Sequence, residues 1–185
     1  HLLIGSFRSI EQSLAPALHH LDSALGRFSA IGDRVGVARA RVWKARTLAA
    51  LGETVDAEME LLQALSTPPE RLTAAERGDF AYLQAEIAAF RGSLGDAVRL
   101  FQRAADTFEG AGLLWRERLA RLRHLQAEAA FILDTNAERG LEDPWTRLEL
   151  LKAPVEGSGS RWLEMEWHRA HALLLAASGE QTEAI

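Results

Sequence analysis

The chain has 185 residues, 21 basic and 26 acidic side chains, a net charge of −5 and no cysteine. These numbers exclude disulfides, cysteine-ligated zinc and a thiol nucleophile, and the acidic total argues against a nucleic-acid-binding surface. Alanine and leucine, both strong helix formers, make up about a third of the chain, so we expect an all-α protein. No apolar run is long enough for a membrane span and no signal peptide is visible, so the expected location is cytoplasmic.

Hydrophobic periodicity and turn signals predict eight helices in chain order. They cover much of 6–31 and then 34–51, 54–66, 73–91, 94–110, 112–133, 143–153 and 160–178, and another helix begins near Glu180. Gly52, Gly92 and Gly179 are expected to end helices in the left-handed backbone conformation. The turns that follow these glycines are short, which implies that successive helices are antiparallel.

Three local signals mark where helices begin. Thr73 and Glu76 have the spacing of a capping box, and Ser93 with Asp96 forms a variant of it. Pro16 is expected in the first turn of a helix, because proline is tolerated there and breaks a helix interior.

A block of small and large apolar residues recurs along the chain at a regular interval. The first copy comprises Ala45, Leu48, Gly52, Ala57, Leu61, Ala64 and Pro69, and the second comprises Ala85, Ala88, Gly92, Ala97, Phe101, Ala104 and Glu109. A further copy begins with Ala172, Leu175, Gly179 and Ala184. Alanine lets two helices approach closely, and the large residue beside it fills the gap, so the block predicts packed helix pairs.

This pattern resembles the tetratricopeptide repeat, in which a glycine closes helix A and helix B carries alanine, a large residue, alanine and proline. The interval, from Ala45 to Ala85, is longer than that of the common repeat and resembles the long repeats of the maltose-regulator-like (MalT-like) bacterial transcription regulators. The resemblance implies a right-handed superhelical solenoid of about four antiparallel helix pairs. We expect a single domain over 1–185 that is a fragment of a longer protein, with repeats at roughly 1–32, 33–72, 73–111, 112–156 and an incomplete 157–185.

The resemblance implies a protein that is not an enzyme and needs no cofactor. We expect a protein-interaction or ligand-sensing segment of a larger bacterial signalling or transcription regulator, which binds a protein, a peptide or a small effector. The alternative is a plain scaffold for protein assembly with no sensing role. The family's groove positions fall on Arg39, Val42, Arg46, Tyr82, Glu86 and Phe90, and the repeat phase adds Gln126 and Arg169. The same residues are also compatible with a solvated or packing face.

Other clusters carry weaker signals. Glu164, His168 and His171 lie on one helical face, but no further histidine is near, so we expect no metal site. A calcium loop beginning at Asp134 is excluded because its sixth position is Arg139 instead of glycine.

Basic and apolar residues outside the groove have structural interpretations. The basic run between Arg116 and Arg123 is expected to be a solvated outer face without nucleic-acid contact. The five tryptophans are expected in the core, and any that are exposed would mark an interface. They are Trp43, Trp115, Trp145, Trp162 and Trp167. We expect Leu173, Leu174 and Leu175 to remain uncovered at the incomplete end of the array, so that the C-terminal helix self-associates.

Overall fold

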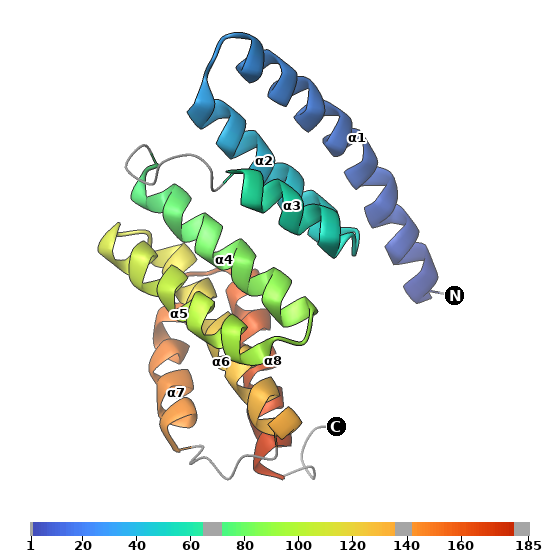
Figure 1. Ribbon diagram of the computed structural model, residues 1–185. Helices are drawn as coiled ribbons and strands as arrows, with labels where there is room; N and C mark the ends of the chain where they lie inside the picture. The colour runs from blue at the N-terminus through green and yellow to red at the C-terminus, as the bar shows by residue number, and fades with distance from the viewer. Residues whose placement is uncertain (1, 65–71, 136–141, 180–185) are drawn as a thin grey trace.

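The computed structural model describes residues 2–64, 72–135 and 142–179, and this part of the chain contains eight α-helices and no strand (Figure 1). The helices are α1 (Leu2–Ala30), α2 (Arg34–Ala50), α3 (Thr54–Ala64), α4 (Ala74–Phe90), α5 (Leu94–Gly110), α6 (Leu114–Thr135), α7 (Glu142–Glu156) and α8 (Arg161–Ser178). The prediction of an all-α protein is confirmed. The helix expected near Glu180 lies outside the described residues.

Left-handed glycines end most of the helices, as the sequence predicts. Gly52, Gly92 and Gly179 have φ values of 83°, 77° and 78°. Gly32 and Gly112 share this conformation and precede α2 and α6 by one short turn. Helices α2, α4 and α6 begin at equal intervals, at positions 34, 74 and 114, so the period seen in the sequence is the period of the helices. Helix α8 begins later than a further equal interval would place it.

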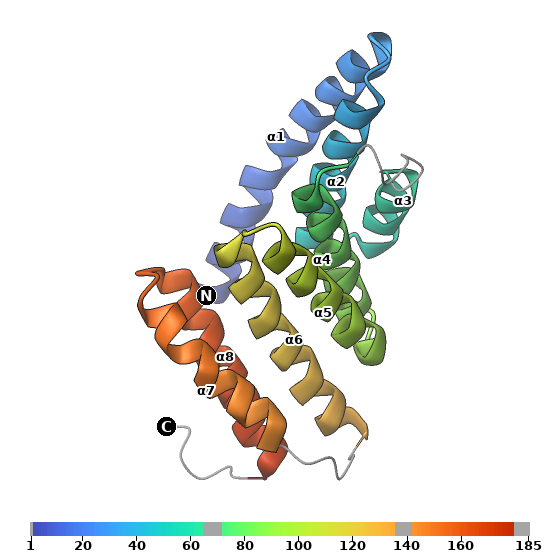
Figure 2. The same ribbon diagram turned by 90° about the vertical axis from the view of Figure 1, so that its left-hand side faces the viewer.

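Each helix packs against the one that precedes it in the chain (Figures 1 and 2). In addition, two pairs of helices that are not consecutive in the chain are in contact: α2 with α4, and α6 with α8. Six alanines of the first two copies of the repeat block are fully buried, as expected, whereas Ala88 is partly buried and Ala172 is exposed. The six are Ala45, Ala57, Ala64, Ala85, Ala97 and Ala104. None of the helices in the described ranges has both the length and the apolar run that a membrane crossing requires.

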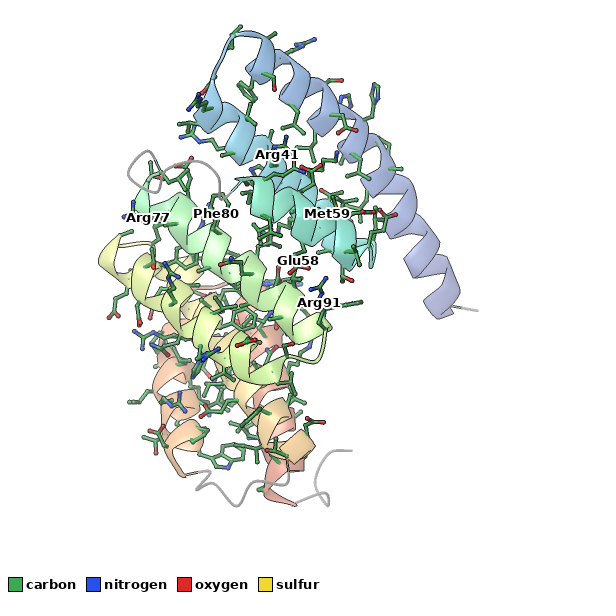
Figure 3. The ribbon with its side chains drawn as sticks, viewed as in Figure 1. Arg41, Glu58, Met59, Arg77, Phe80 and Arg91 are labelled. Atoms are coloured by element: carbon green, nitrogen blue, oxygen red, sulfur yellow. The ribbon has the colours of Figure 1, made fainter. Side chains whose placement is uncertain are left out.

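Ion pairs connect the first helices to one another (Figure 3). Arg41 on α2 donates to the Glu60 carboxylate on α3 at 2.7 Å. Arg91, which follows α4, pairs with Glu58 on α3. Phe80 lies in the apolar core that these helices share. The contacts fix α2, α3 and α4 relative to one another and so define one side of the groove described below.

The expected capping box is present at the start of α4. The Thr73 hydroxyl accepts a hydrogen bond from the Glu76 amide at 3.2 Å, and the Glu76 carboxylate accepts one from the Thr73 amide at 2.7 Å. The variant predicted at Ser93 is wrong. Ser93 is the N-cap residue of α5, but its side chain makes no capping hydrogen bond. The Asp96 carboxylate pairs with Arg99.

The prediction that Pro16 lies in a first turn is also wrong, because Pro16 is inside α1. The Pro16 side chain is exposed. Similarly, α7 continues through Pro154 to Glu156 instead of ending near 153.

Candidate functional site

Helices α2, α4 and α6 line a depression of about 360 Å³, to which α5 contributes Phe108. Its floor is apolar, because Phe80, Leu83 and Phe108 are buried there. Trp43 from α2 and Trp115 from α6 also line it and remain 56% and 46% exposed. Two large aromatic surfaces from separate helices therefore face solvent at one hollow, which is typical of a ligand-binding site.

A second depression of about 450 Å³ adjoins the first and is lined by α2, α4, α5 and α6. Arg46 and Glu86 line both depressions. Alanine is the residue type that lines the second depression most often, and Phe90 is exposed there while Phe101 is buried. We refer to the two depressions together as the groove; because they share lining residues, one extended ligand could reach both.

The structure brings seven of the eight predicted site residues to this groove. The first depression is lined by Arg39, Val42, Arg46, Tyr82 and Glu86, and the second by Arg46, Glu86, Phe90 and Gln126. Arg169 on α8 lines neither depression and pairs with Glu166 at 3.2 Å. That these residues bind a partner stays a prediction. The sequence did not indicate Trp43, Trp115 and Arg116 as groove residues, since their orientation depends on how neighbouring helices pack.

Most of the charged groups in the groove are paired. Arg39 pairs with Glu76, Arg116 with Asp79 at 2.8 Å and Arg123 with Glu166 at 3.3 Å, and each pair joins two different helices. Within the described residues, Arg46 and Glu86 form no ion pair. The Arg46 guanidinium lies 5.8 Å from the centre of the Trp43 ring, as a cation–π contact requires.

The Glu166 carboxylate is fully buried between α6 and α8. One of its oxygens accepts a hydrogen bond from Gln126 Nε2 at 2.9 Å, and the other accepts from Arg123 at 3.3 Å and Arg169 at 3.2 Å. Gln126 Nε2 also donates to the Glu166 backbone carbonyl at 3.0 Å. These bonds satisfy the buried carboxylate, and they extend the polar side chains of the groove as far as α8.

Burial shifts the pKa of several groups in the groove. It raises the pKa of Glu86 above its usual range, although Arg46, Arg123 and a hydrogen bond with Tyr82 favour the charged form. It also raises the pKa of Tyr82 and that of Asp79, the latter despite the pairing with Arg116. Glu86 is therefore a partly buried carboxylate that interacts with Tyr82 but has no ion-pair partner among the described residues, and an added hydrogen-bond donor would stabilise its charged form.

Glu76 behaves in the opposite way. Burial favours its neutral form, but hydrogen bonds from Arg39 and from the Thr73 backbone and hydroxyl outweigh this effect and lower its pKa. The same carboxylate thus caps α4 and pairs with α2. The capping box that the sequence predicted is part of the groove wall.

The basic run is not the solvated outer face that the sequence predicted. Arg116 and Arg123 line the groove, and Arg121 pairs with Glu117 and with Glu109 at 3.0 Å. The acidic partners come from α4, α5, α6 and α8, and most of them are distant in sequence, so the run alone could not reveal them.

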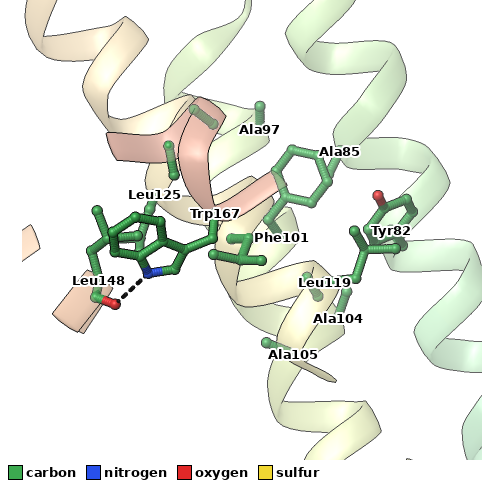
Figure 4. Close-up of a cluster of buried hydrophobic side chains, with 14 of the residues drawn as sticks. Tyr82, Ala85, Ala97, Phe101, Ala104, Ala105, Leu119, Leu125, Leu148 and Trp167 are labelled. Atoms are coloured by element: carbon green, nitrogen blue, oxygen red, sulfur yellow. Dashed lines mark hydrogen bonds between the residues drawn. The ribbon is translucent and has the colours of Figure 1, made fainter. Parts of the chain in front are cut away.

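The tryptophans divide into buried and exposed groups. Trp167 is 8% exposed, and its indole N–H donates to the Leu148 carbonyl at 3.0 Å (Figure 4). The expectation of a core position is wrong for Trp43, Trp115 and Trp162, which are 56%, 46% and 50% exposed. Two of these three exposed side chains belong to the groove.

The leucines of α8 that we expected to be uncovered are packed in the structure. Leu174 is fully buried, and Leu173 packs against the core, because α8 contacts both α6 and α7. The large apolar side chains that α8 exposes are instead Trp162 and Met165. Self-association through α8 stays a prediction.

The histidines of α8 lie among aromatic rings. His171 stacks on Trp167 with ring centres 5.2 Å apart and lies edge-on to Trp145, while His168 is exposed. Over the described ranges, no three histidine, aspartate or glutamate side chains are arranged to hold a metal ion. Position 139 of the rejected calcium loop lies outside these ranges.

Comparison with known proteins gives no match: no protein-family model, curated protein or solved structure matches this chain. The resemblance to tetratricopeptide repeats rests on the residues of the repeat block.

Proposed function

We propose that this chain is a tetratricopeptide-like repeat module that binds an extended segment of a partner protein in the groove between α2, α4 and α6. The observation that carries the proposal is the form of the groove. Two adjoining depressions share Arg46 and Glu86, and Trp43 and Trp115 remain exposed at one of them. An elongated ligand fills both depressions, whereas a compact small molecule fills one.

The spacing of the helices supports a solenoid of about four helix pairs, and the resemblance implies that its superhelix is right-handed. Helices α2, α4 and α6 begin at equal intervals along the chain, and most alanines of the first two copies of the repeat block are fully buried. In such an array alternate helices line one surface, and here α2, α4 and α6 supply most of the side chains of the groove. The function we assign to it is recognition, without catalysis.

Aromatic side chains supply the binding energy in this proposal. Trp43 and Trp115 offer large rigid surfaces that lose little conformational entropy when an apolar side chain packs on them. Paired charges at the rim, such as Arg39 with Glu76, keep the surrounding surface hydrated. Apolar residues of the partner therefore enter the hollow, and its polar groups lie along the rim.

We place this module within a larger signalling or transcription regulator. A segment bound across α2, α4 and α6 contacts several helices at once, so it stabilises one relative arrangement of those helices over others. Binding shifts the equilibrium between helix arrangements only by as much as the segment binds one arrangement more tightly than the others. A scaffold role without sensing predicts the same groove contacts and no such shift.

The test is a selection of peptides from a displayed library on this chain, followed by measurement of Kd by fluorescence anisotropy. Trp43→Ala and Trp115→Ala are each expected to weaken a selected peptide by about thirtyfold, the typical effect of removing a central aromatic residue. Trp162→Ala is the matched control, because Trp162 is similarly exposed but lies on α8 outside the groove. Recovery of no binding peptide, or equal affinity for all three variants, contradicts the proposal.

A further inference from the structure

Arg46 and Glu86 differ from every other charged side chain that lines the groove. Arg39, Glu76, Asp79, Arg116 and Arg123 all take part in ion pairs within the described residues. Arg46 and Glu86 do not, although both line both depressions and therefore lie where the two meet. The centre of the groove thus holds one cation and one anion that are not joined to each other.

The two groups nevertheless influence one another. The positive charge of Arg46 favours the ionised form of Glu86, so they are near neighbours that stop short of direct contact. Arg46 lies over the Trp43 ring, and this contact holds its guanidinium on α2. An unclosed pair of this kind leaves hydrogen-bond donors on one side and acceptors on the other.

Charge in the surroundings argues against a strongly charged ligand at this point. An anion placed at Arg46 would approach Glu86 and Asp79, whose carboxylates also interact with Arg46. A cation placed at Glu86 would approach Arg46 and Arg123. A neutral group that accepts from Arg46 and donates to Glu86 satisfies both without repulsion.

The main chain of an extended peptide has this property. In a strand, the N–H and the C=O of one residue point to the same side, as they do when a residue exchanges two hydrogen bonds with a neighbouring strand. The residues before and after then extend in opposite directions, one toward each depression. The side-chain chemistry of the bound residue itself is not decisive for these two bonds.

We infer that Arg46 and Glu86 together bind one residue of the main chain of an extended partner segment, with Arg46 donating to its carbonyl and Glu86 accepting from its amide N–H. An apolar side chain of the segment then packs against Trp43 and Trp115 in the first depression. This inference rests on the proposed function, and it names the partner as an extended, uncharged stretch of peptide with at least one large apolar residue.

The test replaces backbone amides of a selected peptide one at a time by esters, which removes a single N–H and leaves the side chains in place. At one position the ester is expected to weaken binding to the wild-type chain by about tenfold, because Glu86 loses its donor. In Glu86→Ala the same ester is expected to have less than about a twofold effect, since the acceptor is already absent. Arg46→Ala is expected to weaken the same peptide, since the bound carbonyl loses its donor. Arg99→Ala is the control and is expected to leave the affinity unchanged, because Arg99 is exposed on α5 and pairs within its own helix.

The outcomes separate this inference from the proposed function. A peptide that depends on Trp43 and Trp115 but tolerates an ester at every position keeps the proposed function and overturns the inference. Loss of binding on amidation of the peptide's C-terminus, or competition by a free apolar amino acid at equal affinity, overturns it as well. If Glu86→Ala does not fold, as judged by circular dichroism, the ester series on the wild-type chain still decides.

Discussion

Removal of the Glu166 carboxylate tests how the groove is joined to α8. In Glu166→Ala, Gln126 Nε2 and the Arg123 guanidinium lose the carboxylate that accepts from both of them, and Gln126 Nε2 keeps only the backbone carbonyl of residue 166. Arg169 is half exposed and returns to water. Breaking a buried pair costs about 3–5 kcal/mol. Because one of the three donors is exposed, we expect about 3 kcal/mol, or a fall in Tm of roughly 6–12 °C for a chain of this length.

The free energy of unfolding is measured by urea titration with circular dichroism, and the m-value must stay constant for the comparison to hold. Glu164→Ala serves as the control. Glu164 lies on the same helix, is only partly buried and takes part in no described ion pair, so its removal is expected to change stability by less than about 0.5 kcal/mol. A loss below about 1 kcal/mol in Glu166→Ala would show that the buried network does not hold α8 against α6.

Three further predictions concern stability. A Cβ at Gly78 would lie 2.4 Å from the buried Phe108 ring, so Gly78→Ala is expected to lower the free energy of unfolding by about 1 kcal/mol. Gly26 on α1 has open space around it, so Gly26→Ala is the control and should raise the free energy of unfolding by up to about 1 kcal/mol. Burial lowers the pKa of His124, whose Nδ1 donates to a backbone carbonyl at 3.0 Å and whose Nε2 accepts from Arg147 at 2.9 Å. The unfolded chain therefore binds the proton more readily, so the free energy of unfolding should fall as the pH drops below about 6.5. Urea midpoints measured across this pH range should fall less steeply in His124→Gln than in the wild-type chain. Thr73→Ala removes the hydroxyl of the capping box and is expected to cost about 1 kcal/mol in the same assay, and an unchanged midpoint would contradict the cap's importance.

Local signals predicted most of the helices because they act within a few residues. A glycine such as Gly92 needs only its own turn to adopt positive φ, and Thr73 needs only Glu76 to form a cap. The repeat phase similarly placed Arg46 and Glu86 on one surface, since a common interval brings equivalent positions of α2 and α4 together.

The features that the sequence did not reveal depend on contacts between distant segments. Glu166 lies 40 residues after Gln126, the interval that also separates Arg46 from Glu86 and Glu86 from Gln126, so the repeat phase continues through the longer α6 into α8. Arg169, which we expected in the groove, lies three positions beyond Glu166 and pairs with it. The phase alone could not show that the Glu166 carboxylate is buried against α6. The exposure of Trp43 and Trp115 likewise depends on the gap between α2 and α6, which no local pattern encodes.

The equal spacing of α2, α4 and α6 has a consequence for how such a chain can change its length. A left-handed glycine, Gly32 or Gly112, lies in the turn before α2 and in the turn before α6, and α4 begins midway between these two helices. A tandem duplication of one such interval, with its ends in these turns, would insert a complete helix pair without shifting any residue downstream to another face. The groove would gain one more set of side chains, and recombination within the gene could thus alter which partners are bound while the existing hydrophobic contacts are kept.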